Sequence, residues 1–439
     1  MTEVQLITLD PGHFHAALVQ KESYPGVARR VHVYAPLGPD LFAHLGRIAG
    51  FNQRRDNPTG WELEIHAGPE FLARLLAEKP GNVVVLSGRN RHKIDYLQAA
   101  VEAGLHVLAD KPWIISATDR LRLEAVINTA EAKGLIAYDI MTERYEITSI
   151  LQRQLVNNAD IFGSVVPGTL DEPGVFLESV HHLMKSVAGV PLRRPAWFFD
   201  TTQQGEGLTD VGTHLVDLVP GMLFPNQALD HRRDLQVQQG RRWPTTLSRD
   251  DFRRVTGESD FPDYLTAHTR NGQLDYFCNT AVSYRLRGIQ VRLNILWEYE
   301  STAGGGDTHL AVFRGTRARV EVRQGKEQNF RPELYVVPNE AAERDGVAAA
   351  LRNRVVGLNG DYPGLGVADE GERLRVTVPD RYRVGHEAHF GEVARQFLHF
   401  LDHPATLPAW EKPNLLAKYF VTTEGVRLSL LSLGRPCRA

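Results

Sequence analysis

The first third of the chain alternates between short apolar runs and longer stretches that are apolar on one face. Apolar runs bounded by turn residues predict buried strands, and the one-sided stretches between them predict helices. The predicted strands cover Val4–Leu9, Val31–Ala35, Asn82–Ser87, His106–Ala109 and Leu135–Ile140. The predicted helices cover Phe14–Gln20, Glu70–Glu78, Lys93–Ala103 and Thr118–Lys133, and Gly104 and Gly134 end the last two. This alternation favours an α/β domain over residues 1–140, with a parallel sheet covered by helices on both faces.

The remainder of the chain has the period-two pattern of antiparallel strands. From Ile289 to Tyr299 apolar side chains occupy every second position, as in a strand with one buried face. Further strands are predicted at Leu274–Cys278, Val282–Leu286, His309–Phe313, Ala318–Val322 and Glu333–Val337, helices at Phe390–Leu401 and Asn414–Leu431, and an exposed loop at Asn359–Gly371. We therefore expect residues 141–439 to form an α+β domain on a large, mostly antiparallel sheet, with C-terminal helices that pack back on the first domain.

Composition narrows the class of protein. The 439 residues are 42% hydrophobic and 23% charged with a formal net charge of −3, which is typical of a globular protein and argues against nucleic acid as a partner. Two cysteines are too few for a disulfide framework or a thiolate metal cluster. The chain begins without a basic and apolar leader and has no apolar run of membrane-spanning length, so we expect a cytoplasmic protein with no membrane contact.

The loop after the first predicted strand lies where a dinucleotide-binding domain carries the sequence GxGxxG. It reads Asp10, Pro11, Gly12, His13, Phe14, His15 and Ala16. Only Gly12 matches, and the loop alone is as typical of an ordinary tight turn. The pair His13 and His15 is disfavoured as a metal site, because residues two apart at a helix start do not share a face. Tyr34, Ala35 and Pro36 follow the second strand without an acid or arginine, so the choice between NAD and NADP stays open.

The segment from Asn82 to Pro112 carries the most specific motif. A buried strand leads into a loop with Ser87, Asn90 and His92, and the next strand ends in Ala109, Asp110, Lys111 and Pro112. This order resembles the glucose-fructose oxidoreductase, inositol dehydrogenase and MocA family, in which a TPNxxH-type loop is followed by a Glu-Lys-Pro strand end. Asp110 stands where that family usually has glutamate.

A second stretch about a hundred residues later extends the resemblance. It runs from Gly205 to Asp217 and contains Asp210, Gly212 and His214, similar to the family's glycine-rich DxGxH motif. Two residues four apart lie on one helix face. Without the family pattern, the favoured interpretation is that Asp210 is a carboxylate at a helix start and His214 a packed histidine. With the family pattern, a catalytic role for both is favoured.

The resemblance implies a Rossmann-like domain, a second domain, and an NAD(P)-dependent oxidoreductase that acts on a sugar, a polyol or a related hydroxy compound. It implies that His214 accepts the hydroxyl proton, that Lys111 stabilises the alkoxide and that Asp210 positions His214 or the substrate, at a site between the two domains. It also implies a homo-oligomer that associates through the large sheet. The cofactor, NAD or NADP, is expected to contact Pro11, Gly12, His13, Phe14, Ser87, Asn90, His92, Asp110 and Lys111.

Two further pairs are candidates for contact with a carbohydrate-like substrate. Arg144 and Tyr145 follow the last parallel strand, and His181 and His182 precede Lys185; structural roles are equally compatible with both pairs. Two other functions stay open. A bound, recycled NAD would serve glycoside cleavage or epimerisation, and the sparse glycine loop is compatible with a non-catalytic protein that kept the fold.

Overall fold

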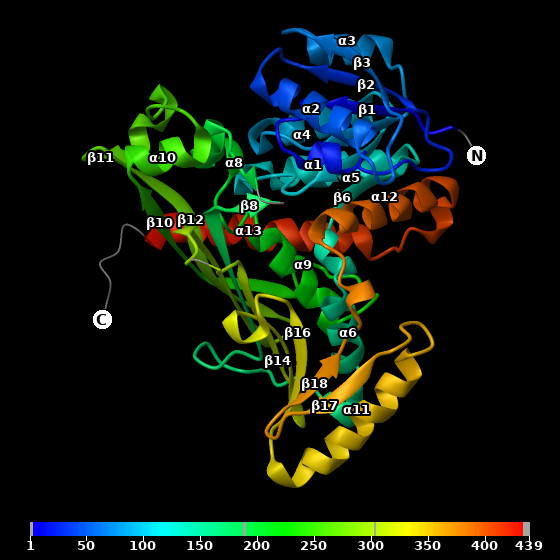
Figure 1. Cartoon of the computed structure of the whole chain (residues 1–439), viewed down its shortest axis with the longest axis vertical. Helices are drawn as coiled ribbons and strands as arrows, with labels where there is room; N and C mark the ends of the chain where they lie inside the picture. Colours follow the sequence, from blue (N-terminus) through cyan, green and yellow to red (C-terminus); the bar gives the residue numbers. More distant parts are fainter. Residues whose placement is uncertain (1–2, 188–189, 303, 433–439) are drawn as a thin grey trace. The chain divides into compact units, whose positions relative to one another are not determined.

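The computed structural model describes residues 3–187, 190–302 and 304–432, and it divides into two compact units (Figure 1). The first unit contains the chain up to Thr142, Thr202–Gly205 and Gly385–Tyr419. The second unit contains Glu143–Thr201, Glu206–Val384 and the chain from Phe420. Each unit is thus assembled from segments that are far apart in the sequence.

A six-stranded parallel sheet forms the centre of the first unit, in the order β3-β2-β1-β4-β5-β6. Its strands are β1 (Leu6–Leu9), β2 (Arg30–Ala35), β3 (Glu62–Ala67), β4 (Val83–Leu86), β5 (His106–Asp110) and β6 (Ala137–Ile140). Its helices are α1 (His15–Leu18), α2 (Pro39–Gln53), α3 (Phe71–Glu78), α4 (Lys93–Glu102), α5 (Arg120–Ala132), α12 (His386–Asp402) and the first part of α13 (Glu411–Ser432). This strand order is that of a doubly wound dinucleotide-binding sheet, so the predicted Rossmann-like fold is confirmed.

The sheet is held by an apolar core on which sequence-distant helices pack. The four residues of β4 are all buried, as expected of a central parallel strand that is covered on both faces. Leu97 of α4 and Val126 of α5 join this core, and so do Leu415 and Tyr419 from the far end of the chain.

One element of the first unit departs from the sequence prediction, and two elements were not predicted. The helix expected over Phe14–Gln20 is a single turn, α1, because the backbone N–H groups of Gln20 and Lys21 donate to carbonyl oxygens three residues back, those of Ala17 and Leu18, and not four residues back as in an α-helix. The left-handed glycines Gly104 and Gly134 end α4 and α5 as predicted. Helix α2 and the edge strand β3 were missed; α2 contains two glycines, Gly46 and Gly50, and β3 has a single buried residue, His66.

A large mixed sheet forms the second unit, in the order β10-β12-β13-β7-β14-β15-β16-β18-β17, with β11 paired to β12. Its strands are β7 (Val175–Met184), β10 (Leu235–Leu247), β11 (Thr269–Arg270), β12 (Gln273–Leu286), β13 (Ile289–Glu300), β14 (Thr308–Arg314), β15 (Ala318–Gln324), β16 (Glu333–Pro338), β17 (Gly366–Asp369) and β18 (Leu374–Thr377). The pair β13 and β7 is parallel and the other pairs that the structure describes in this sheet are antiparallel. The mostly antiparallel sheet is therefore confirmed.

Helices cover this sheet and shorter elements flank it. The helices are α6 (Ile147–Val156), α7 (Ala159–Phe162), α9 (Gly212–Leu223), α10 (Arg249–Thr256) and α11 (Arg344–Leu358), and the strands β8 (Ser186–Val187) and β9 (Val190–Pro191) are short. The short helix α8 (Thr201–Gln204) belongs, apart from Thr201, to the first unit. Helix α6 packs on β15 and β16, and α9 packs on β13.

Two sequence interpretations of the second unit need correction, and two elements were not predicted. The strands predicted at Leu274–Cys278 and Val282–Leu286 are one strand, β12, which is continuous because β10 follows it along most of its length through two register shifts. The predicted loop at Asn359–Gly371 contains β17, which pairs with β18. Strand β10 and helix α10, for which the sequence analysis offered no element, were missed.

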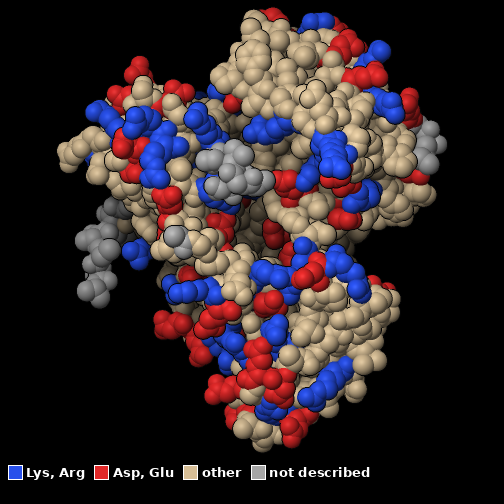
Figure 2. Space-filling model, in the orientation of Figure 1, with Lys and Arg blue, Asp and Glu red and all other residues tan. Residues whose placement is uncertain are grey.

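The surface carries charges of both signs. Acidic and basic side chains are interspersed over the face drawn in Figure 2. Among the described helices, none combines the length and the apolar content needed to cross a bilayer.

Candidate active site

The loops after β1 and β4 lie side by side at the carboxyl edge of the first unit's sheet. Successive strands are added on one side of β1 up to β3 and on its other side from β4, so the order of the strands reverses between β1 and β4, which is the usual ligand position in such folds. The backbone N–H of His13 donates to the carbonyl oxygen of Ser87 at 3.1 Å, and that of Gly12 donates to Asp10 at 2.8 Å. A Cβ atom on Gly88 would lie 2.2 Å from the Asp10 carbonyl oxygen. Only glycine therefore permits this approach of the two loops.

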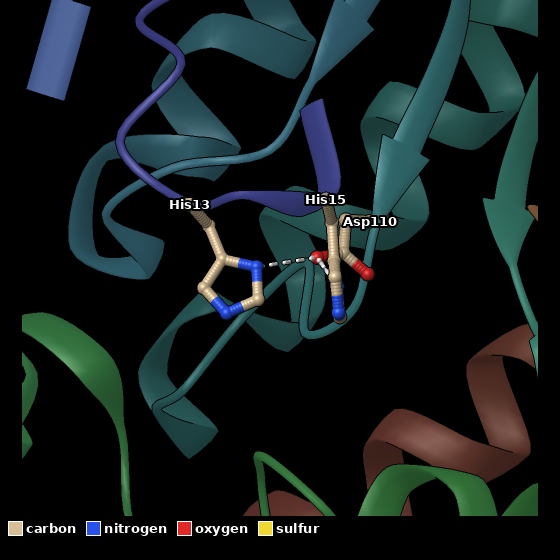
Figure 3. A group of neighbouring side chains, drawn as sticks. All are labelled: His13, His15 and Asp110. Atoms are coloured by element: carbon tan, nitrogen blue, oxygen red, sulfur yellow. Dashed lines mark hydrogen bonds and ion pairs between the residues drawn. The ribbon is translucent and has the colours of Figure 1, made fainter. Parts of the chain in front are cut away.

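The Asp110 carboxylate lies against two imidazoles, that of the predicted cofactor residue His13 and that of His15, which was not predicted (Figure 3). Nδ1 of His15 lies 2.8 Å from Oδ2 of Asp110, the Ser87 hydroxyl donates to the same oxygen at 3.1 Å, and Nδ1 of His13 is 3.7 Å from it. His13 precedes α1, so the helix-face argument that separated it from His15 does not apply. The two imidazoles do converge, and they converge on Asp110.

The electrostatics of this cluster define its protonation. Burial opposes ionisation of Asp110, but His15, Lys93 and Lys111 outweigh it and hold the pKa of Asp110 well below its usual value. Burial lowers the pKa of both His13 and His15, the former strongly. At neutral pH we therefore expect an aspartate beside two neutral imidazoles. Since an ionised carboxylate only accepts hydrogen bonds, Nδ1 of His15 carries the proton.

A buried lysine that the sequence analysis missed fixes the end of β5. Lys93 is 2% exposed, and its ammonium group donates to Oδ1 of Asn90 and to the carbonyl oxygen of Asp110, both at 2.7 Å. The amide of Asn90 donates in turn to the carbonyl oxygen of Gln204 at 2.7 Å. Asn90 is thus bound within the protein, and Lys93 holds the backbone directly before Lys111, which is itself 8% exposed. The peptide bond between Lys111 and Pro112 is cis.

The other predicted cofactor residues differ in their surroundings. His92 has an exposed side chain that contacts Asp95 at 3.2 Å, so it lies apart from the Asp110 cluster. Pro11 is buried and Phe14 is half-buried. The ring of Phe14 lies against the rings of His13 and His15.

The glycine-rich stretch before α9 belongs to the second unit. A Cβ atom on Gly207 would lie 1.8 Å from the carbonyl oxygen of Cys278 in β12, so this loop is pressed onto the sheet. Asp210 is buried and lies in the turn before α9, whereas His214 lies in the first turn of α9 and is half-buried. The expectation that both residues lie on one helix is therefore wrong, because α9 begins at Gly212, after Asp210.

The sequence analysis did not identify two buried charged residues of the second unit, Arg194 and Glu206. Arg194 is buried, burial lowers its pKa, and the Asp210 carboxylate partly offsets that effect. The guanidinium group of Arg194 also donates to backbone carbonyl oxygens of His182 and Leu183 at 3.2 and 2.9 Å. Burial raises the pKa of Glu206 to about 7 although Arg242 contacts it at 2.6 Å. Their partners are distant in sequence, so no local pattern could have revealed them.

The proposed substrate residues already have protein partners. Arg144 donates to both carboxylate oxygens of Asp217, at 2.6 and 2.8 Å, and Tyr145 is half-buried. His181 and His182 lie 3.3 and 3.0 Å from the carboxylate of Asp307. Lys185 donates to that carboxylate at 2.7 Å. Burial opposes ionisation of Asp307, yet His181 and Lys185 hold its pKa well below the usual value.

The residues around the β1 and β4 loops fit a dinucleotide. At Gly12 a Cβ atom would lie 3.3 Å from a carboxylate oxygen of Asp40 and 3.4 Å from the Cα atom of Gly88. A side chain would fill this space, and its absence leaves backbone that a pyrophosphate can approach. Asp40 offers a carboxylate for ribose hydroxyls, and the partly exposed Arg89 offers a cation for phosphate.

Comparisons with known proteins point to the same class. A family model described as "Putative oxidoreductase C terminal domain" matches residues 151–430. The crystal structure of a putative oxidoreductase from Parabacteroides merdae ATCC 43184 is 44% identical in sequence, covers 98% of each chain and superposes with a TM-score of 0.96. No curated protein matches the chain.

More distant structures share the fold. GenD2 from gentamicin A biosynthesis, solved in complex with NAD, is 15% identical over 98% of this chain and 95% of its own, with a TM-score of 0.58. KijD10, a 3-ketoreductase from Actinomadura kijaniata solved with NADP and TDP-benzene, is 14% identical over 95% of both chains, with a TM-score of 0.55. With its family model and its 44% identical relative, the chain belongs to the family of oxidoreductases that carry this C-terminal domain.

Proposed function

We propose that the protein is an NAD(P)-dependent oxidoreductase of the glucose-fructose oxidoreductase, inositol dehydrogenase and MocA type, which transfers hydride between the nicotinamide and a hydroxyl or keto group of a sugar, a polyol or a derivative. The observation that carries this proposal is the buried Lys111 at the carboxyl end of β5, directly after the Asp110 cluster. GenD2 with NAD and KijD10, a 3-ketoreductase with NADP, support the cofactor and the reaction by shared fold.

Three residues carry the proposed proton and charge chemistry. The imidazole of His214 accepts the hydroxyl proton as the substrate is oxidised, and the ammonium group of Lys111 stabilises the alkoxide charge that develops on that oxygen. The carboxylate of Asp210 positions His214 or the substrate. A nicotinamide ring, when bound, supplies the hydride acceptor.

The Asp110 cluster prepares the cofactor side of this reaction. Lys93 anchors the backbone before Lys111, so the reactive ammonium group is presented from a fixed strand end. His15 holds the Asp110 carboxylate in place. Gly12, Gly88 and Ser87 shape the two loops, and Pro11, His13 and Phe14 line the first of them. Asn90 supports Lys93, whereas His92 contributes only if its exposed ring turns toward the cofactor.

Replacing Lys111 by methionine tests the proposal, because it removes the charge and keeps most of the side-chain volume. We expect turnover to fall by about 10²- to 10⁴-fold, the range associated with loss of one positioned catalytic group. Calorimetric binding of NAD or NADP should remain measurable. Lys326→Met, at an exposed position, is the matched control and should be fully active. A Lys111→Met variant as active as the control would rule out this role for Lys111.

The reaction products distinguish a second function with the same fold. If the cofactor is bound and recycled, the substrate is cleaved or epimerised without net formation of NADH. A substrate screen that records both product identity and NADH absorbance separates this outcome from simple dehydrogenation.

The single glycine and the one-turn helix α1 favour a third possibility, a protein that kept the fold without binding a dinucleotide. Calorimetric titration of the full chain with NAD and with NADP decides between them. Binding of either supports the proposed function, and binding of neither contradicts it. The family resemblance also leads us to expect a homo-oligomer that associates through the large sheet of the second unit.

A further inference from the structure

A group of polar side chains gathers on one face of the outer strand pair β2 and β3, and the proposed reaction uses none of them. In the parallel register His32 is opposite Glu64, and Tyr34 is opposite His66. Side chains two apart on a strand share a face. Two imidazoles and a carboxylate are therefore brought together on this face.

The distances among their polar atoms match a metal site. Nδ1 of His32 lies 3.2 Å from Nε2 of His66, and the Glu64 carboxylate lies 3.7 Å from each of these nitrogens. Two ligand atoms bound to a tetrahedral Zn²⁺ at about 2.0–2.1 Å are about 3.3 Å apart. A hydrogen bond between the imidazoles accounts for one of the three contacts, whereas a shared cation accounts for all of them.

Burial and exposure are distributed as an ion site requires. His32 and His66 are 7% and 6% exposed, so their rings are held by the protein. The Glu64 side chain is 49% exposed, which leaves a path for the ion and room for a water molecule at the fourth position. Two histidines, one glutamate and a water form a known zinc ligand set.

Surrounding residues orient the imidazole of His66. Nδ1 of His66, the nitrogen that faces away from His32, lies 3.8 Å from the carboxylate of Glu78 on α3. Tyr34 donates to that carboxylate at 2.5 Å, and Arg74 donates to it at 2.6 Å. The ring of Tyr34 also stacks on that of His66, with centroids 4.2 Å apart. A carboxylate hydrogen-bonded to the second nitrogen is the usual support of a metal-binding histidine. Glu78, at 3.8 Å, is beyond hydrogen-bond length and is the nearest carboxylate in position to take that role when an ion holds the other nitrogen of His66.

We propose that His32, His66 and Glu64 bind a divalent transition-metal ion, with Zn²⁺ as the best match, and that the ion fastens the edge strand β3 to β2. The other group of this composition, His13, His15 and Asp110, is a weaker candidate. There the Asp110 oxygen nearest both rings already accepts hydrogen bonds from His15 and from Ser87.

Zinc binding to the full chain tests the proposal directly. After treatment with a chelator, the protein is titrated with Zn²⁺ by calorimetry and with Co²⁺ by visible absorption, and thermal unfolding is followed with and without Zn²⁺. We expect one ion per chain, a cobalt spectrum of low coordination number, and a higher unfolding temperature with zinc, since an ion that binds only the folded state stabilises it.

Variants locate the ion. Glu64→Gln changes an exposed side chain and should fold normally, yet it should weaken zinc binding at least tenfold; His66→Ala should abolish it. Glu78→Gln should weaken binding by about 10- to 100-fold, the usual effect of losing such a support. His403→Ala, which removes an exposed histidine stacked on His399 at the end of α12, is the control and should bind as the wild type does.

Three results would overturn the proposal: no stoichiometric binding, binding unaffected by Glu64→Gln, or binding lost in His15→Ala but kept in His66→Ala. If His66→Ala does not fold, Glu64→Gln still decides the question. These measurements need no turnover, so they are independent of the proposed oxidoreductase activity.

Discussion

Replacing Gly88 by alanine probes the approach of the two loops at the centre of the dinucleotide-binding sheet. The added Cβ atom would lie 2.2 Å from the carbonyl oxygen of Asp10 and 3.1 Å from the backbone nitrogen of Gly12. Ordinary contact begins near 3.4 Å, so one loop must move by about 1 Å. Both neighbours are backbone atoms, and no side-chain rotation can relieve the overlap.

Overpacking of this kind costs about 1–3 kcal/mol. For a unit of this size, each kcal/mol lowers the unfolding midpoint by about 2–4 °C, so we expect a decrease of about 2–12 °C. A displacement of 1 Å in a positioning loop also lowers turnover by about 100-fold, and we expect weaker binding of NAD(P).

The matched control is Gly46→Ala, in the middle of α2. No atom lies within 4 Å of its added Cβ, and glycine in a helix interior is less favourable than alanine by about 0.5–1 kcal/mol. This variant should therefore unfold at a slightly higher temperature and bind the cofactor unchanged. If Gly88→Ala has the melting temperature and the cofactor affinity of the wild type, the two loops do not pack as described.

Two further predictions concern buried charge. Asp139→Asn should lower the free energy of unfolding by about 3–5 kcal/mol, because it leaves the buried ammonium group of Lys418, 2.9 Å away, without its carboxylate. The exposed ion pair of Glu131 and Lys412 is the control. In the same thermal melts Glu131→Gln should lower the free energy of unfolding by less than about 1 kcal/mol. Burial raises the pKa of Glu146 from its ordinary value of 4.5 to about 7. The folded state therefore binds this proton more tightly than the unfolded state. The stabilisation from the bound proton is complete below pH 4.5 and is lost as the pH rises through 7. Glu146→Gln removes this titration, and its melting temperature relative to wild type should rise between pH 5 and pH 8; a constant difference would contradict the assignment.

The apolar pattern of the sequence predicted the elements whose stability depends on burial. Strands β4 and β5 are almost wholly buried, so their runs of valine and leucine identified them. Strand β3 lies at the sheet edge and has only one buried residue, so it lacks the continuous apolar run by which the buried parallel strands were identified, and its short polar and apolar alternation was overlooked. Strand β10 escaped prediction for the same reason, since it also ends its sheet and is mostly polar.

The candidate site was predictable where it coincides with a strand end. Asp110 and Lys111 terminate β5, and the motif identified them without knowledge of their neighbours. Lys93 was not predictable, because a lysine in a helix is normally exposed and its burial depends on Asn90 and on the Asp110 carbonyl. The pairing of Arg144 with Asp217 joins residues 73 positions apart, and no local pattern reports such contacts.

The discontinuous makeup of the first unit has a consequence for synthesis of the protein. Strand β6 is completed at Ile140, yet the residues that cover it emerge last: Tyr138 packs on Phe397 and Phe400, and Asp139 is paired by Lys418 and Tyr419. During synthesis, β6, at the edge of the parallel sheet, therefore stays uncovered while more than two hundred residues of the second unit are translated. Nascent chains stalled before Gly385 should expose this edge to chaperones and proteases, because residues 385–419 complete the first unit.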